Sequence, residues 1–79
     1  MPFPDSCRIY DVVRILYIHR PSRESVLPRV GDTATIVFVL GDGAAYILES
    51  VESDGMTRWL AEFERGDLDC EIVWAAPNG

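Results

Sequence analysis

Hydrophobic and polar positions alternate along most of the chain in short segments, and turn residues separate these segments. The pattern predicts five β-strands, at residues 8–18, 33–40, 45–52, 56–63 and 69–74. The period of the first segment also fits a helix, but its β-branched and aromatic residues favour a strand. The chain is therefore expected to be all-β.

The residues between the segments predict how the strands are connected. Glycines accept the positive φ that tight hairpins require, so Gly41-Asp42-Gly43 and Ser53-Asp54-Gly55 predict two hairpin turns. Pro21 and Pro28 exclude a helix between residues 19 and 30, which are expected to form a long loop. The spacing predicts one domain over residues 1–79, a five-stranded antiparallel barrel with tails at 1–7 and 75–79.

The strand at residues 33–40 is apolar on both faces. Alternation places Ile36 and Phe38 together on one face, opposite Val37. A small barrel buries one face of each strand, so an exposed apolar patch is expected, and such patches mark protein interfaces. The alternative is that the long loop, through Val26 and Leu27, or the C-terminal tail covers it. The expected interface comprises Ile36, Phe38, Ile47 and Trp59.

Length and composition narrow the class of protein. A chain of 79 residues is only marginally stable alone, and disulfides, a metal, oligomerisation or unusually good packing are the natural solutions. The expected apolar patch favours self-association into a homo-oligomer. Its hydrophobic content of 48% suits a packed core. No apolar run is long enough to cross a bilayer, and the first residues lack the basic start and apolar centre of a secretory signal. A cytoplasmic location away from membranes is expected.

Charge is distributed unevenly around a net value of −6. Residues 1–31 carry +2 and residues 32–79 carry −8. An acidic domain repels phosphate, which disfavours nucleic acid and favours a basic protein partner. The alternative is a nucleic-acid-binding loop formed by Arg20, Arg23 and Arg29.

Candidate chemistry is sparse. Two cysteines and one histidine are too few for a metal site, and no cofactor motif is present. His19 lies in the long loop without a nearby nucleophile motif, so no catalytic residue is assigned. Cys7 and Cys70 are expected to be neighbours if the end strands pair. The sequence leaves open whether they form a disulfide.

Several segments resemble a family of small bacterial proteins of unknown function that have an SH3-like barrel. The family reads Tyr-Asp-Val-Val, then Gly-Asp-x-Gly-Thr-Val-Val, Ala-Tyr-x-Val-Glu-Phe and Gly-x-Thr; this chain has these segments near Tyr10, Gly31, Ala45 and Gly55, and a similar closing Gly66-Asp67-Leu68. It departs from the pattern at Ala34, Ile47, Ser50 and Trp59. The resemblance implies an SH3-like fold, a bacterial origin and a non-enzymatic role. Some members are the smaller partner in two-gene units beside a suspected toxin, which suggests an antidote or immunity protein.

These observations together predict a non-catalytic protein-binding module that self-associates, in the form of an antidote-type partner of another bacterial protein. One alternative is a nucleic-acid-binding barrel that uses the arginine-rich loop. Another is an accessory subunit or small-ligand binder in which Tyr46, Trp59 and Trp74 line a groove.

Overall fold

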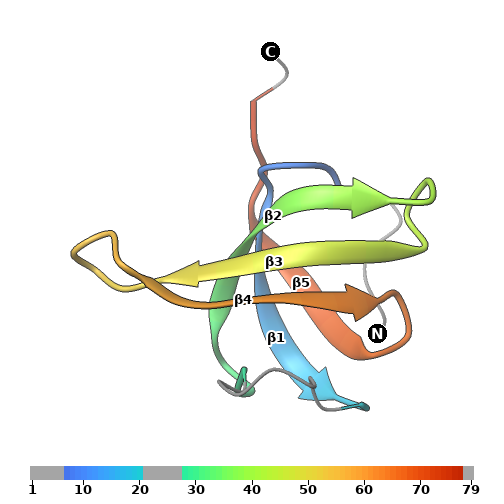
Figure 1. Cartoon of the computed structure of the whole chain (residues 1–79), viewed down its shortest axis with the longest axis horizontal. Helices are drawn as coiled ribbons and strands as arrows, with labels where there is room; N and C mark the ends of the chain where they lie inside the picture. Colours follow the sequence, from blue (N-terminus) through green and yellow to red (C-terminus); the bar gives the residue numbers. More distant parts are fainter. Residues whose placement is uncertain (1–6, 21–27, 78–79) are drawn as a thin grey trace.

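Five antiparallel strands form a single sheet in residues 7–20 and 28–77, the part of the chain that the computed structural model describes (Figure 1). The strands are β1 (Val12–Ile18), β2 (Thr33–Leu40), β3 (Ala45–Val51), β4 (Thr57–Glu64) and β5 (Leu68–Trp74). Every second residue is buried in β3 from Tyr46 to Ser50 and in β4 from Trp59 to Phe63, as expected for a sheet with one face on a core. The predicted all-β class and the five strands are confirmed, and the described residues contain no helix.

The first strand begins four residues later than its sequence pattern predicts. Residues 8–11 form a turn in which the Asp11 N–H donates to the Arg8 carbonyl at 3.1 Å. Tyr10 lies at φ 73° inside this turn, a conformation that no strand contains. The correction follows from backbone geometry, because the chain must turn before Val12 can pair with β2.

The sheet has the strand order β4-β3-β2-β1-β5. Three consecutive strands form hairpins, and β5 returns to pair with β1 (Figure 1). The sheet is not closed, because among the described residues β4 and β5 are its two edges. The expected pairing of the first and last strands is confirmed by the register Ile15↔Cys70.

A β-bulge in β2 overturns the predicted distribution of its side chains. Ile36 pairs with Leu48, but Phe38 pairs with Ile47, so Val37 is an extra residue in β2. The bulge shifts the alternation by one position. Ile36 is therefore buried while Phe38 is exposed, although simple alternation had placed them on the same face.

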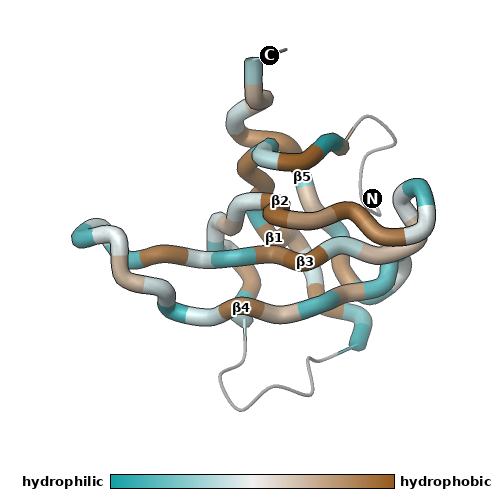
Figure 2. The backbone as a smooth tube through the Cα atoms, turned by 45° about the horizontal axis from the view of Figure 1, so that its top comes forward, coloured by the Kyte–Doolittle hydropathy of each residue, from teal (hydrophilic) through white to brown (hydrophobic). Residues whose placement is uncertain are grey.

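The buried hydrophobic residues form one core cluster on one face of the sheet. None of the described residues forms a helix with the length and hydropathy that crossing a bilayer requires. Figure 2 colours the backbone by residue hydropathy and shows hydrophobic residues in the middle of the strands and hydrophilic residues at the hairpin tips. Ser50 is buried among apolar side chains, and its hydroxyl donates to the Thr33 carbonyl at 2.8 Å. The buried hydrophobic residues are Val13, Ile15, Ala34, Ile36, Tyr46, Leu48, Trp59, Ala61, Phe63, Leu68 and Cys70.

Three aspartates close turns in the same way. Asp11, Asp32 and Asp67 each donate their N–H to the carbonyl of the residue three positions earlier. In each turn the aspartate carboxylate accepts the N–H of that same earlier residue at 3.0 Å. This reciprocal pair satisfies two backbone groups within the turn itself. The aspartates therefore have a structural role in the loops.

The two predicted hairpin turns are confirmed. The β2–β3 turn contains Gly41, Asp42 and Gly43, all at positive φ. The β3–β4 turn contains Gly55 at φ 88°, and the Glu52 N–H donates to the Met56 carbonyl across it. The long loop after β1 includes residues 21–27, so the predicted cover by Val26 and Leu27 lies outside the described residues.

Candidate functional site

Two of the four predicted interface residues belong to the core. Ile36 has no exposed surface, and Trp59 is only 4% exposed. The Trp59 ring stacks edge-on against Phe63, and its Nε1–H donates to Asp32 Oδ2 at 3.1 Å. Ile36 precedes the bulge and lies on the same face as the buried Ala34, and the register of β4 places Trp59 opposite the buried Ser50. The expectation that both side chains are exposed is therefore wrong, and the groove suggested for Tyr46, Trp59 and Trp74 is absent from the described residues, because Tyr46 is buried too.

The other two predicted residues lie together on the outside of the sheet. Phe38 is 52% exposed, and it pairs directly with the half-buried Ile47. Ile47 pairs in turn with Glu62 of β4, and Leu60 lies two residues from Glu62 on the same side of that strand. Leu60 is 53% exposed. Phe38, Ile47 and Leu60 thus form an apolar group across three strands.

Sequence reasoning missed Leu60, although the signal was present. In residues 57–64 the alternation that buries Trp59, Ala61 and Phe63 must expose Leu60 and Glu62. Assigning Trp59 to the outer side concealed this pattern. We call the group formed by Phe38, Ile47, Glu49, Leu60 and Glu62 the outer face.

The outer face is acidic around its apolar centre. Glu49 pairs with Leu60, and Glu62 pairs with Ile47. The Glu49 carboxylate accepts the Thr57 hydroxyl at 2.7 Å, so its position is fixed. The nearby cation, Arg58, forms ion pairs with Glu52 at 3.2 Å and with Asp32 at 3.5 Å. The face therefore presents apolar surface flanked by carboxylates.

The arginines of the alternative binding loop are only partly described. Arg20 forms ion pairs with Glu64 at 3.7 Å and with Asp67 at 3.6 Å, which reduces the positive charge it presents to a phosphate. Arg29 donates its backbone N–H to Asp32. Arg23 lies outside the described residues. The described residues thus bring none of these arginines together into a basic patch.

The cysteines occupy adjacent sites. Cys70 is buried in the core, and Cys7 packs against the core cluster. Burial raises the pKa of Cys70 to about 12 and the pKa of Cys7 to about 11, and the nearby Cys7 contributes to the shift of Cys70. Both thiols are therefore protonated at neutral pH, which suits packing and disfavours nucleophilic attack.

His19 lies on the outside of the sheet. Its Nε2 is 2.9 Å from Asp69 Oδ1, and this hydrogen bond lowers the pKa of Asp69. Cys70 follows Asp69 in β5 and points to the core side, so Cys70 and the His19–Asp69 pair lie on opposite faces of the strand.

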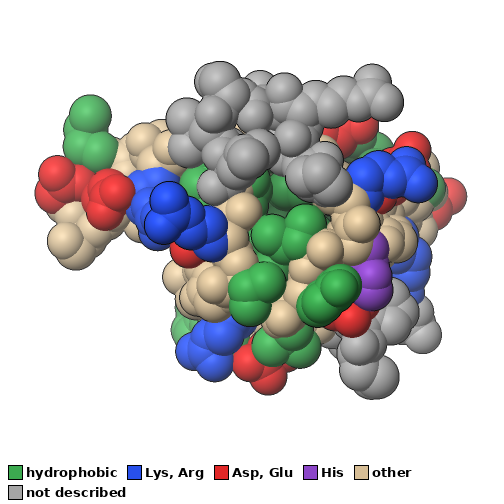
Figure 3. All heavy atoms as spheres, turned by 90° about the horizontal axis from the view of Figure 1, so that it is seen from below, with side chains coloured by type: hydrophobic (Ala, Val, Ile, Leu, Met, Phe, Trp, Pro, Cys, Tyr) green, Lys and Arg blue, Asp and Glu red, His purple; other side chains and the backbone are tan. Residues whose placement is uncertain are grey.

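A second exposed apolar area lies on the surface that includes His19. Tyr17 packs against the His19 ring at a centroid distance of 4.8 Å. Figure 3 shows hydrophobic side chains in the middle of the surface seen from below, with the histidine beside them and charged side chains around them. Charges of both signs border this area, and Arg14 and Glu71 pair at 3.2 Å. Unlike the outer face, it therefore has no clear preference for a partner of one charge.

The described residues contain no group of three or more histidine, cysteine or acidic side chains that could hold a metal ion.

Compared with protein-family models, with curated proteins and with solved structures, the chain shows no match.

Proposed function

We propose that this chain is a non-catalytic protein-binding module with an SH3-like barrel fold, and that its outer face binds a basic protein surface. The SH3-like part of the proposal is supported by the strand order, in which the last strand pairs with the first. The binding role is supported by one observation above the others. The exposed Phe38 and Leu60 and the half-buried Ile47 lie on the same side of three paired strands, bordered by Glu49 and Glu62.

The chemistry of the outer face favours a partner with apolar and basic side chains. Apolar burial supplies most of the free energy of such contacts, at about 25 cal/mol per Å². Carboxylates around the apolar centre attract lysine and arginine and accelerate capture. Two copies of the outer face would bring Glu49 and Glu62 near their own counterparts, which opposes self-association through it. An antidote that covers a basic protein is the form of this function that best fits the charge.

The proposal is tested with three variants in a pull-down from the source cell. Leu60→Glu and Phe38→Glu place a carboxylate in the apolar centre, and Tyr17→Glu makes the same change on the other exposed area. We expect a basic protein to be captured by wild type and by Tyr17→Glu, and to be lost from both outer-face variants. Equal capture by all four proteins would refute the assignment.

Two further measurements accompany the pull-down. Phe38 is half exposed, so Phe38→Glu should melt within a few degrees of wild type, which shows that lost capture is not lost folding. The solution mass, measured by light scattering with and without reductant, tests self-association. A wild-type oligomer that dissociates in Leu60→Glu would identify a second copy as the occupant of the outer face and overturn the basic partner.

A further inference from the structure

The second half of β2 has a strand on one side only. β1 pairs with β2 at Thr33, Ala34 and Thr35 and then diverges. The last backbone hydrogen bonds on this side involve Ile36. Its carbonyl accepts the Tyr10 N–H at 2.6 Å, and its N–H donates to the Asp11 carbonyl at 2.9 Å. Beyond Ile36, β3 continues along the other side as far as Leu40, while no described strand lies on the β1 side. Within the described part of the chain, residues 37–40 therefore form an open edge inside the sheet (Figure 1).

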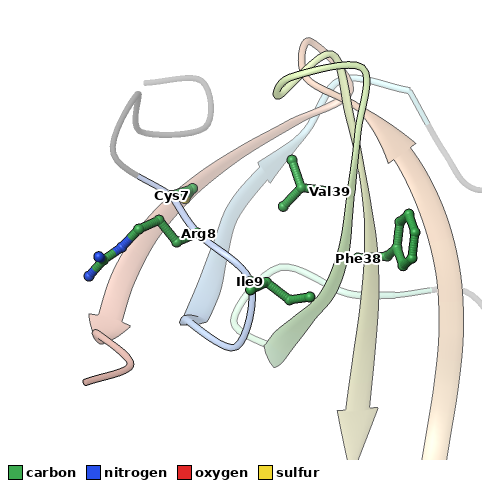
Figure 4. Close-up of a pocket in the computed structure, with 5 residues that line it drawn as sticks. All are labelled: Cys7, Arg8, Ile9, Phe38 and Val39. Carbon is green, nitrogen blue, oxygen red and sulfur yellow. The ribbon is translucent and has the colours of Figure 1, made fainter. Parts of the chain in front are cut away.

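A groove of about 450 Å³ lies along this open edge. Residues 7–9 form one wall, and Phe38 and Val39 form the other. Figure 4 shows Val39 pointing from β2 toward the segment that carries Cys7 and Ile9, while Phe38 points to the opposite side of the strand and the Arg8 side chain extends away. The volume falls within the range of pockets that bind ligands. The side chains that face the groove are thus mainly apolar.

The wall formed by residues 7–9 is held by hydrogen bonds. The Asp11 carboxylate accepts the Arg8 N–H at 3.0 Å and the Ala76 N–H at 2.8 Å, which ties this wall to the segment after β5. The Tyr10 N–H donates to the Ile36 carbonyl at the closed end of the groove. These contacts exist before any ligand binds, so little ordering free energy is lost on binding.

We propose that residues 37–40 accept an extended peptide strand, which enters the groove beside residues 7–9 and continues the sheet. The inference rests on the proposed protein-binding function and deepens it, because it specifies how the partner binds. In this mode backbone hydrogen bonds give affinity, and alternate side chains enter pockets that give specificity. A side chain of the added strand would lie between Ile9 and Val39, and its neighbours would lie outside, close to Phe38.

Three observations favour an isolated basic peptide as the occupant. Residues 7–9 line one side of the groove and Phe38 and Val39 line the other, which favours a single strand over the edge of another sheet with its own neighbouring strand. Residues 33–40 contain neither charged residues nor proline, the two features that normally protect an edge from pairing. The net charge of −6 favours basic residues on the parts of the peptide that lie outside the groove, away from the Arg8 cation on its wall. Residues 37–40 span roughly 10 Å, and at their far end the Leu40 carbonyl already accepts the Gly43 and Ala44 N–H groups. The peptide therefore needs apolar side chains at alternate positions over about four residues.

The test uses a fluorescent hexapeptide of alternating valine and arginine, with its partly N-methylated form as the control. N-methylation keeps the composition and charge but removes the N–H groups that would bond to β2. We expect the plain peptide to bind and the methylated one to bind at least about tenfold more weakly. Amide NMR of the complex should show the largest shifts at residues 37–40 and 7–9.

Two substitutions locate the binding site. Ile9→Arg places a cation in the groove and should weaken binding at least about tenfold. Val51→Arg adds the same charge at an exposed site on β3 and should weaken it far less. Equal binding of both peptides, equal effects of both variants, or the absence of binding would overturn strand addition. Shifts centred on Glu49 and Leu60 would overturn it too, but they would support the outer face, so the two proposals fail separately.

Discussion

Removing the Asp11 carboxylate should be among the most destabilising polar substitutions in this protein. The side chain is buried and bridges two backbone N–H groups that are 68 positions apart in the chain, those of Arg8 and Ala76. A hydrogen bond to a charged group contributes about 1.5–3 kcal/mol. Because Asp11→Ala also removes the cost of burying the carboxylate, we expect a net loss of about 2–4 kcal/mol.

This loss is large for so small a domain. At about 0.05–0.15 kcal/mol per residue, the whole chain has a free energy of unfolding of roughly 4–12 kcal/mol. Urea unfolding followed by tryptophan fluorescence should therefore show a midpoint lower by roughly 1–3 M. Asp11→Asn keeps one acceptor but turns an amide N–H group toward a backbone donor, so its midpoint should lie between those of wild type and Asp11→Ala.

Glu62→Gln is the matched control, since it removes one negative charge from an exposed site. It should change the free energy of unfolding by less than about 0.5 kcal/mol. If Asp11→Ala unfolded within that margin of wild type, the two N–H groups would be equally well satisfied without the carboxylate. The account of the wall formed by residues 7–9 would then be wrong.

Further predictions concern the core, one turn and the thiols. In Trp74→Phe the remaining Trp59 should emit at short wavelength and resist acrylamide quenching, whereas in Trp59→Phe the exposed Trp74 should be quenched readily. Gly43→Ala should cost about 1–2 kcal/mol in urea unfolding, because φ is 98° and the added Cβ would lie 3.3 Å from the nearest side chain; Gly66→Ala, with open space, should cost far less. Cys70 should resist iodoacetamide at pH 8 until urea unfolds the chain. Its raised pKa of about 12 stabilises the fold below the ordinary value of 9.0, and this contribution should decline as the pH rises from 9 toward 12.

The turns show how far local sequence alone can be read. The hairpin turns at Gly41-Asp42-Gly43 and Gly55 are predicted correctly, because tolerance of positive φ is a property of glycine itself and needs no knowledge of the fold. The reciprocal bonds of Asp32 and Asp67 are local in the same sense. The start of β1 was not read correctly, because a β-branched segment does not reveal where the chain has to turn to meet its neighbour.

The candidate site shows where local reading ends. Phe38 and Ile47, two of the expected interface residues, pair across the β2–β3 hairpin, because the turn length fixes the pairing near it. Ile36 was misplaced because the bulge at Val37 depends on how β2 fits both β1 and β3. One extra residue moves every side chain beyond it to the opposite face of the strand, and no nearby residue type indicates where the bulge occurs.

The sequence by itself determined the strand segments, the hairpin turns and the acidic balance, since all three follow from short-range periodicity, backbone preference and composition. Tertiary structure decided which apolar residues are exposed, because burial depends on register and on the bulge. It also decided that Trp59 belongs to the core and that Leu60 belongs to the outer face. The open edge at residues 37–40 is likewise a tertiary feature. It arises where β1 diverges from β2, after the hydrogen bond between Tyr10 and Ile36, which are far apart in the chain.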